Sequence, residues 1–547
     1  MIRILLGLGK LFCVFLLWNC ANPKAITGGP KDTTAPKLVK AIPKSKTINF
    51  NSRVIILEFD EWVKLNNLQK ELLITPSIKG SYKVKEYKKK VVLEFEKPFE
   101  ENTTYTFNFR KGIQDITEGN PAKDLQIVFS TGEKLDSLQI SGFAKFLLTN
   151  QPAAECSVWL AAADDTLQVD KHLPYYLTQT DKSGNFRLQN LKAGKYNLFV
   201  FQDKNNNNLL NAEQEMVGFV KETIVLDTAN RDTLLVELAP MDKKPPKLLR
   251  FRPSNTQTDK SFLDFSKGIE EITIESSAKI AYQIADNGKE VMLYNLEKKY
   301  DSLEIKIKAI DSLGNRLDTS RKIIFLKELR SGKPKKEPFK VELKNKSQGE
   351  GVLPNLHLAL VFSKPVANEN LGKIQFFKDQ DSTQAIGLEA KETEWNKYKT
   401  QLQIRKNIPF REQIRLQIDS AAFESVEQDF SRRIEQKFEP KNPVRFATIK
   451  LEVSTEKKNY IIELLDEKKN VVRRFDSNTE TLPANKIIVW NYLPALTYQV
   501  RAIIDENRNS KWDTGDYKQR ILPEKIIFMP KEIPVRENWE VSEKFSF

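Results

Sequence analysis

Two short loops in this chain place oxygen-bearing side chains at alternating positions. The segment "IIDENRNSKWDTGDY" (503–517) carries Asp505, Asn507, Asn509, Asp513 and Asp516. Calcium loops place their ligands at such alternating positions, because a tightly curling backbone points every second side chain inward. These residues would occupy positions 1, 3, 5, 9 and 12 of a calcium loop. The pattern therefore indicates a candidate site for a structural Ca²⁺ ion.

A sister loop, "DKNNNNLLNAEQ" (203–214), repeats this pattern with Asp203, Asn205, Asn207 and Asn211. It has only Gln214 at position 12, and Asn208 and Ser510 stand at position 6 of the two loops, where calcium loops have Gly. Each loop follows an apolar strand-like run, which excludes a helix–loop–helix hand. The alternative is a metal-free turn, because Asp and Asn hydrogen-bond to their own backbone. Both interpretations stay open, and no other cofactor is expected.

The sequence offers little else for catalysis. The two histidines, His172 and His357, lie far apart in the chain, so neither a His-rich zinc site nor a Ser-His-Asp arrangement is suggested. Glu58, Asp60 and Glu61 of "EFDEW" could supply one carboxylate of a glycosidase pair, but nothing nominates the second. No phosphate-binding Gly loop is found. We therefore expect no enzyme activity.

The N-terminus has the features of an export signal. Residues 1–19, "MIRILLGLGKLFCVFLLWN", carry Arg3 and Lys10 and are otherwise almost wholly apolar. This is typical of a secretory signal, and the run after Lys10 is too short to span a bilayer. Cys20 follows directly, which resembles a bacterial lipoprotein signal with Cys20 lipidated. The alternative is an ordinary signal with an incidental Cys. Residues 20–34 are rich in Gly, Pro and Thr and predict a flexible tether.

Net charge limits the classes of partner that are expected, and the cysteine content indicates whether a disulfide is expected. Removal of the predicted signal leaves 85 basic and 73 acidic residues, a net charge of +12. This surplus would suit anionic lipid head groups, but the densest basic runs, 85–90 and 332–337, are short and predict a strand edge and a linker. Nucleic acid is not expected, because an exported chain rarely meets it. Cys156 lies in the apolar run "AECSVWLA" and is expected in a core, without a disulfide.

The elements that must position the loops are predicted to be β-strands. Short runs of β-branched and aromatic residues alternate with turns, as in "VIILEF" (54–59), "TYTFNF" (104–109) and "YNLFVF" (196–201). This spacing is typical of β-sandwiches, and 547 residues indicate several domains. The expected fold class is all-β, with several β-sandwich domains in tandem after the signal peptide.

The chain is partly duplicated. "LKAGKYNLFVFQDKNNN" (191–207) aligns with "LPALTYQVRAIIDENRN" (493–509), and "ILEFDEWV" (56–63) aligns with "ALVFSKPV" (359–366), at nearly the same offset. This predicts a two-domain unit that was duplicated. A further echo, "APKLVKAIP" (35–43) against "PPKLLRFRP" (245–253), marks two domain starts. We expect linkers at 240–247 and 329–338 and domains at 35–132, 135–238, 247–328, 339–440 and 444–547.

Family resemblance supports this division. The first domain resembles a bacterial Ig-like domain of the kind named after an S-layer protein, on the motifs "APKLVKAIP", "ILEFDEWV", "ENTTYTFNFRKGIQDITEGNP" and "IVFSTG". The fourth is similar to a diverged version, with "LVFSKPV" but without the "I.D..GN" turn. The second resembles a transthyretin-like or carboxypeptidase-regulatory-like sandwich on "TQTDKSGNFRLQNLKAGKYNL" (178–198), and the fifth follows it through the repeat. The third is expected to be an Ig-like β-sandwich. The resemblance thus implies an all-β fold of tandem Ig-like and transthyretin-like β-sandwich domains after a lipoprotein signal peptide.

The whole arrangement, with the opening "TGGPKDTTAPKLVK", resembles the Ig-like lipoproteins of Bacteroidetes outer membranes. That resemblance implies a lipid anchor in the outer membrane and no enzyme activity, and it implies no ligand. We expect a non-catalytic scaffold with an outer-membrane protein partner, as a subunit of a barrel-assembly, secretion or transport machine. A cell-surface adhesin or glycan-binding module is the alternative, and an uncharacterised hydrolase comes third. Whether the anchored chain faces the cell surface or the periplasm is left open, and the cell surface is favoured.

Overall fold

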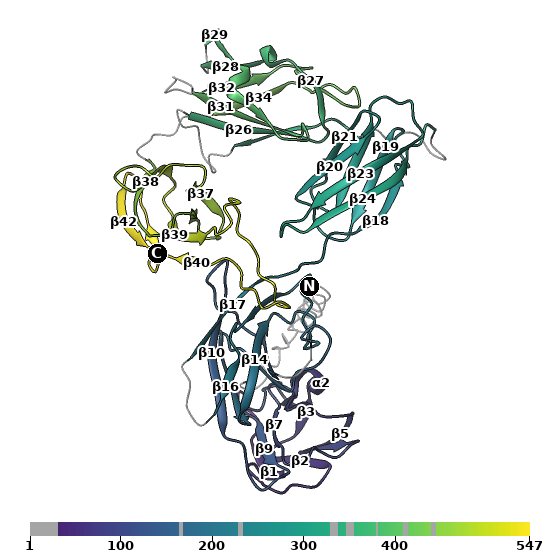
Figure 1. Cartoon of the computed structure of the whole chain (residues 1–547), viewed down its shortest axis with the longest axis vertical. Coiled ribbons are helices and arrows are strands. Elements are labelled where there is room, and N and C mark those ends of the chain that lie inside the picture. Colours follow the sequence, from purple (N-terminus) through teal and green to yellow (C-terminus); the bar gives the residue numbers. More distant parts are fainter. Residues whose placement is uncertain are drawn as a thin grey trace, which may run out of the picture.

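The structure of the protein is a computed structural model that describes residues 31–163, 168–227, 233–328, 337–345, 355–378, 381–407, 414–438 and 445–547. The predicted signal peptide, Cys20 and most of the tether lie outside these residues. Five β-sandwich units follow one another along the chain, which confirms the all-β prediction (Figure 1). The described helical elements are single turns: α2 (Leu68–Glu71), η1 (Leu371–Lys373) and η2 (Ala390–Glu392). Within the described ranges, no helix has the length and apolar character needed to cross a membrane.

The first unit places a four-stranded sheet, in the order β1-β2-β6-β5, against a three-stranded sheet β4-β7-β9 and a pair β3-β8. In β2, alternate residues Ile55, Leu57 and Phe59 are buried, as a half-covered strand requires. The strands of this unit are β1 (Leu38–Ile42), β2 (Val54–Phe59), β3 (Val63–Leu65), β4 (Leu73–Thr75), β5 (Tyr82–Tyr87), β6 (Lys90–Phe95), β7 (Thr104–Asn108), β8 (Ile113–Asp115) and β9 (Gln126–Ser130).

The third and fourth units repeat the four-stranded order of the first, as β18-β19-β22-β21 and β25-β26-β31-β30. The third unit consists of β18 (Leu248–Pro253), β19 (Lys260–Phe265), β20 (Glu271–Ser276), β21 (Ile280–Ile284), β22 (Glu290–Asn295), β23 (Ser302–Ile310) and β24 (Arg316–Ile324). The fourth consists of β25 (Val341–Asn345), β26 (Asn355–Phe362), β27 (Val366–Glu369), β28 (Ile374–Lys378), β29 (Asp381–Gly387), β30 (Thr393–Trp395), β31 (Gln401–Asn407), β32 (Ile414–Ile418), β33 (Phe423–Ser425) and β34 (Ile434–Phe438).

The second and fifth units share a different topology, in which the first and last strands pair in parallel, β10 with β17 and β35 with β42. The second unit consists of β10 (Leu138–Phe146), β11 (Ser157–Ala162), β12 (Tyr176–Gln179), β13 (Asn185–Leu191), β14 (Gly194–Phe201), β15 (Met216–Phe219), β16 (Ile224–Leu226) and β17 (Leu234–Pro240). The fifth consists of β35 (Ala447–Ser454), β36 (Tyr460–Leu465), β37 (Val471–Asp476), β38 (Ile487–Leu493), β39 (Thr497–Ile504), β40 (Ile526–Phe528), β41 (Ile533–Pro534) and β42 (Glu540–Ser546).

A buried aspartate closes the turn after β8 in the first unit. Asp115 accepts the backbone N–H groups of Glu118 at 2.8 Å and Gly119 at 2.7 Å, and the side-chain amide of Asn120 at 2.7 Å. Burial opposes the charge of Asp115, but these hydrogen bonds outweigh it and hold its pKa below the ordinary value. Asp311 of the third unit accepts from Asn315 in the same way. The "D…GN" motif is therefore a structural turn in both units.

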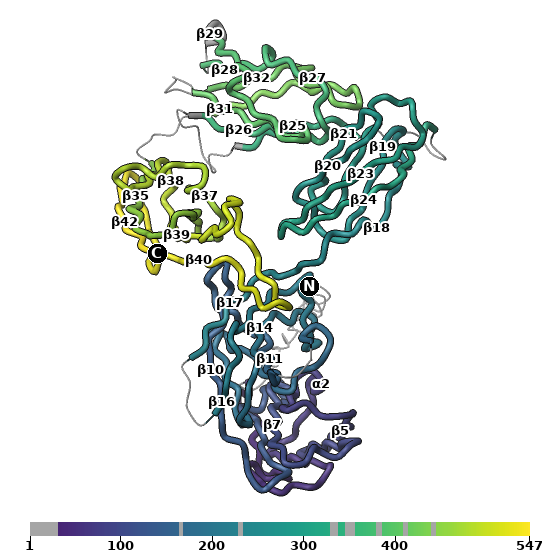
Figure 2. Tube along the Cα trace, in the orientation of Figure 1, coloured from purple at the N-terminus to yellow at the C-terminus, as the bar shows by residue number. Residues whose placement is uncertain are grey.

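The fifth unit returns to lie beside the second, although 206 residues separate the end of β17 from the start of β35 (Figure 1 and Figure 2). The five units each have a core cluster of their own, and a sixth cluster of buried apolar residues is shared by the second and fifth units. The predicted linker at 240–247 also packs. Met241 and Asp242 are buried in it, and Asp242 pairs with Lys267 of the third unit at 2.6 Å. Its first residues therefore belong to the packed structure.

Candidate functional site

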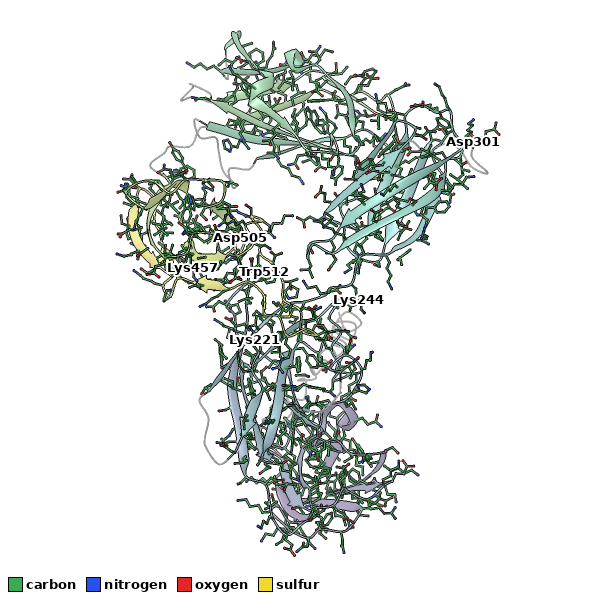
Figure 3. The ribbon with its side chains drawn as sticks, in the orientation of Figure 1. Lys221, Lys244, Asp301, Lys457, Asp505 and Trp512 are labelled. Carbon is green, nitrogen blue, oxygen red and sulfur yellow. The ribbon has the colours of Figure 1, made fainter. Side chains whose placement is uncertain are left out.

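Asp505 follows β39 and is completely buried beneath the loop that it opens (Figure 3). Its Oδ1 accepts the backbone N–H of Asn509 at 3.1 Å, and its Oδ2 accepts the backbone N–H of Ser510 at 2.9 Å. The side-chain amide of Asn478 donates to the same Oδ2 at 2.6 Å. The loop backbone therefore curls around this carboxylate. Ser510 has a φ of 61°, so a non-glycine residue takes the left-handed position.

The structure brings three further predicted residues together around this loop. The Oδ2 atom of Asp513 accepts the side-chain amide of Asn509 at 2.7 Å and that of Asn507. The side-chain oxygens of Asn507 and Asn509 in turn accept backbone N–H groups two residues further along. Asp516 does not join this network, because its Oδ1 accepts the N–H groups of its own turn, from Lys518 at 2.9 Å and Gln519 at 3.1 Å.

A glutamate that the spacing argument missed completes the loop. Glu524, just before β40, accepts the backbone N–H of Glu506 at 2.8 Å and that of Asp513 at 2.9 Å. Burial raises the pKa of Glu524, and the charges of Asp513 and Asp505 raise it further. The loop therefore gathers three carboxylates whose mutual repulsion a cation would relieve.

The sister loop has the same architecture. Asp203 accepts the backbone N–H groups of Asn207 at 3.0 Å and Asn208 at 2.8 Å. Glu215 accepts those of Lys204 at 2.9 Å and Asn211 at 2.7 Å, which matches the role of Glu524. Burial raises the pKa of Glu215, and Asp203 adds to the rise. The side-chain oxygens of Asn205 and Asn207 accept from the loop backbone, as they do in the fifth unit.

The sequence did contain a signal for Glu215 and Glu524, but it lies outside the twelve-residue spacing of a calcium loop. Glu215 stands directly before β15, in "EMVGF" (215–219), and Glu524 stands two residues before β40, in "EKIIF" (524–528). The loop of the fifth unit is the longer one. Both sets of donors combine carboxylate and amide oxygens, the ligands that Ca²⁺ prefers. In the described part of the chain, no group of three or more His, Cys, Asp or Glu residues has the closeness expected for a metal site. The amides of Asn are thus an essential part of either loop.

The loops lie at the contact between the second and fifth units. Leu210 of the Asp203 loop is buried in the shared apolar cluster. Trp512 of the Asp505 loop packs against this cluster, and its indole N–H donates to the backbone carbonyl of Glu524 at 3.0 Å. The buried members of the cluster are Leu147, Trp159, Ala161, Val169, Phe201, Leu210, Val217, Phe219, Ala239, Met241, Ile461, Ile503, Tyr517 and Ile526. The two loops therefore contribute to the packing of one unit on the other.

Polar contacts surround this cluster. Arg520, on the longer loop of the fifth unit, donates to the Asn197 side chain at 2.5 Å and to the Val220 carbonyl at 2.8 Å in the second unit. Lys518 pairs with Asp170 at 2.9 Å. Lys221, labelled in Figure 3, accepts a further hydrogen bond from Arg520 through its carbonyl. The extra length of this loop is used to hold the second unit.

The other sequence candidates have structural roles. His172 accepts the backbone N–H of Gln168 at 3.2 Å, and His357 lies on β26 of another unit. Asp60 accepts the backbone N–H of Lys37 at 2.8 Å at the end of β2. Cys156 is buried, as expected, and burial raises the pKa of its thiol to about 12. A thiol that stays protonated is a poor nucleophile.

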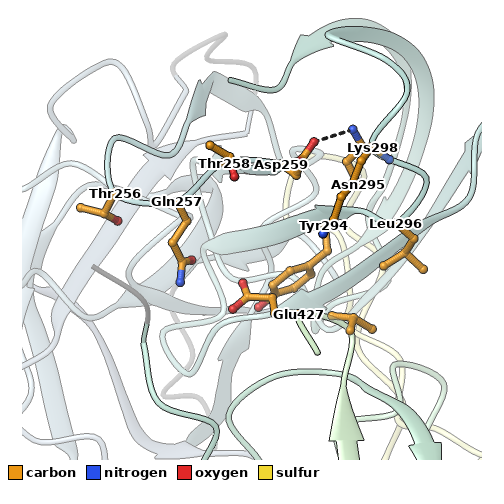
Figure 4. Close-up of a pocket in the computed structure, with 10 residues that line it drawn as sticks. Thr256, Gln257, Thr258, Asp259, Tyr294, Asn295, Leu296, Lys298 and Glu427 are labelled. Carbon is orange, nitrogen blue, oxygen red and sulfur yellow. Dashed lines mark hydrogen bonds between the residues drawn. The ribbon is translucent and has the colours of Figure 1, made fainter. Parts of the chain in front are cut away.

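A small cavity lies between the third and fourth units (Figure 4). It has a volume of about 220 Å³, and its lining includes Tyr294 of β22 and Glu427 of the fourth unit. Asn295 donates to Asp259 at 2.9 Å beside it. Nearby, the Tyr398 hydroxyl of the fourth unit accepts the backbone N–H of Ile272 at 3.0 Å. The feature is the seam between two packed units.

Comparison with known proteins identifies one part of the chain. A family model described as a bacterial Ig-like domain matches residues 32–131. The comparison with curated proteins found no significant match.

Among solved structures, the chain is similar to BcpA, the major pilin subunit of Bacillus cereus, with 11% identity, coverage of 75% of this chain and 99% of that chain, and a TM-score of 0.13. It is also similar to the surface layer protein SbsC, domains 1–6, with 12% identity, coverage of 92% and 68%, and a TM-score of 0.14. A DUF3823 family protein from Bacteroides uniformis is similar with 11% identity, coverage of 56% of this chain and 100% of that chain, and a TM-score of 0.13. Scores this low carry no functional conclusion. The family match and the strand order together show that the first unit is a bacterial Ig-like domain.

Proposed function

We propose that the chain is a non-catalytic scaffold of the outer membrane, anchored by a lipid on Cys20. In this proposal it binds an outer-membrane protein as an accessory subunit of a barrel-assembly, secretion or transport machine. The observation that carries the proposal is the buried contact between the second and fifth units, which sets sandwiches far apart in sequence in one arrangement. A surface built from several units binds a partner at lower entropic cost when those units are already held in place.

We further propose that the Asp505 and Asp203 loops bind Ca²⁺ as a structural ion. The supporting observations are the carboxylate and amide side chains gathered in each loop and the burial of Glu524 and Glu215 beside further carboxylates, which raises the pKa of both glutamates. Because Leu210 and Trp512 extend from these loops into the shared cluster, an ion there would also stiffen the contact between the units.

The scaffold proposal is tested by affinity purification from membranes after mild solubilisation and chemical crosslinking. We expect one outer-membrane protein to be recovered in fixed proportion to the chain. The Cys20→Ser variant is the matched control: it retains every described residue, and it should lose the partner together with the membrane. Recovery of the folded, membrane-bound chain without a partner, with and without crosslinking, would contradict the proposal.

A further inference from the structure

Two strands of the second and fifth units are buried on both faces, which an isolated sandwich does not require. In β11, Val158 and Leu160 point into the core of the second unit, while Trp159 points to the opposite face and into the shared cluster. In β36, Ile462 belongs to the core of the fifth unit and Ile461 to the shared cluster. Neighbouring side chains of a strand point to opposite faces. The shared cluster is therefore formed by the outer faces of two complete sandwiches.

The two faces that meet are equivalent in the duplicated sequence. The gapless alignment of the repeat, at an offset of 302, carries the second unit onto the fifth. At that offset, residues of the cluster fall on each other at Phe201 with Ile503 and at Leu210 with Trp512. Beyond the longer loop, the strand registers match Val217 of β15 with Ile526 of β40, because Val217 pairs with Phe201 and Ile526 pairs with Ile503. In β11 and β36, the registers match Ser157 with Ile461 and Trp159 with Glu463. A contact between equivalent surfaces is the arrangement found in two-fold dimers.

The closed contact also has a weakness that a domain core normally lacks. Within the described structure, three buried polar atoms at this contact have no hydrogen-bond partner: Trp159 Nε1, Asp170 Oδ1 and Arg520 Nε. All three of these residues line a cavity of about 250 Å³ at the contact, so the two units do not pack there as closely as the inside of a domain does. The apolar cluster favours closure. The contact therefore has the character of a docking interface between two folded bodies.

We propose that this face is a pairing surface for units of its own repeat, and that its partner outside the chain is a second copy of this chain. The fifth unit of one copy would dock on the second unit of another, through the contacts that the single chain makes with itself. Such an exchange needs no new interaction. In the intact chain the internal partner has the advantage of a high effective concentration, so pairing between copies stays hidden until the internal contact is disabled. This proposal does not depend on the membrane anchor.

A complementation experiment tests it with two single variants of the full chain. Trp159→Lys disables the face of the second unit, and Ile503→Lys disables the face of the fifth. Both side chains point away from the core of their own unit, whose members at the adjoining positions include Val158 and Ala502. Each variant alone should be monomeric. An equimolar mixture should form a one-to-one dimer, because each copy brings the intact face that the other lacks. Sedimentation velocity measures the masses.

The control is Leu235→Lys, at a position on β17 that is 56% exposed and outside the cluster. A mixture of Leu235→Lys with either test variant should stay monomeric, because the second and fifth units of Leu235→Lys still pair with each other. A mixture of the two test variants that remains monomeric, with both folded by circular dichroism, would overturn the proposal. If either variant fails to fold, Trp159→Ser and Ile503→Ser replace the two lysine variants in the same experiment. A one-to-one dimer in their mixture would support pairing between copies, and folded monomers alone would refute it.

Discussion

The ion pair of Glu463 and Arg501 offers the sharpest test of how the fifth unit is held. Arg501 Nη2 lies 2.6 Å and Nε 2.8 Å from Glu463 Oε2, and the two side chains are only 12% and 7% exposed, respectively. Arg501 also donates to the Leu148 carbonyl of the second unit. The pair lies on the outer sheet face that carries the shared cluster. It therefore joins the fifth unit to the second.

Removing one partner should cost far more than removing both. Glu463→Ala leaves the guanidinium buried beside a single carbonyl, and breaking such a pair typically costs about 3–5 kcal/mol of unfolding free energy. The double variant Glu463→Leu with Arg501→Met buries no charge. Replacement of a buried pair by apolar residues is often neutral. The double variant should therefore be at least about 2 kcal/mol more stable than Glu463→Ala, well beyond the few tenths expected for independent sites.

Urea denaturation followed by tryptophan fluorescence measures these differences in the transition of the fifth unit, where Trp490 is buried. The matched control is Glu452→Ala, which breaks the exposed pair of Glu452 with Lys544 on the same unit, 52% and 61% exposed. An exposed pair contributes about 0–1 kcal/mol. If Glu463→Ala costs no more than Glu452→Ala, or if the double variant is the least stable, the argument from burial is wrong.

Three other predictions follow from the loops, the anchor and the buried turn. Millimolar calcium should raise the melting temperature, because an ion that binds only the folded state stabilises it. Asp505→Ala with Asp513→Ala should reduce this rise to the part that the Asp203 loop contributes, and Asp516→Ala should keep all of it. No shift in the wild type would leave both loops as metal-free turns. Cys20→Ser should move the protein from the membrane to the soluble fraction, and a variant that stays membrane-bound and intact would contradict lipidation. Because the folded pKa of Asp115 lies below its ordinary value of 3.8, its stabilisation is complete above that pH and is lost as pH falls through the folded pKa. Asp115→Asn should flatten this acid-side loss in melting temperature against pH, and an unchanged slope would refute the assignment.

The local features of this protein could be predicted from the sequence because they depend on neighbours along the chain. Alternation in "VIILEF" predicts β2, since a strand with one covered face must bury every second residue. Asp505, Asn507, Asn509 and Asp513 were found together because a curling loop brings residues of nearby sequence number onto one centre. Glu524 was missed because it joins the Asp505 loop from a position 18 residues beyond Glu506, after a segment whose length no fixed spacing predicts.

Only the tertiary structure decided what the outer faces do. In "SVWLAA" and "YIIELL" nearly every residue is buried, and the sequence alone shows only that both faces of these strands are covered. It does not show what covers them, because hydrophobic burial has no direction and any apolar surface of matching shape would serve. The structure places Trp159 in one apolar cluster with Ile461 and Ile503 from the far end of the chain. Nearby residues in the sequence thus determine the strands and the loops, whereas packing across the whole molecule determines what covers the outer face of each sandwich.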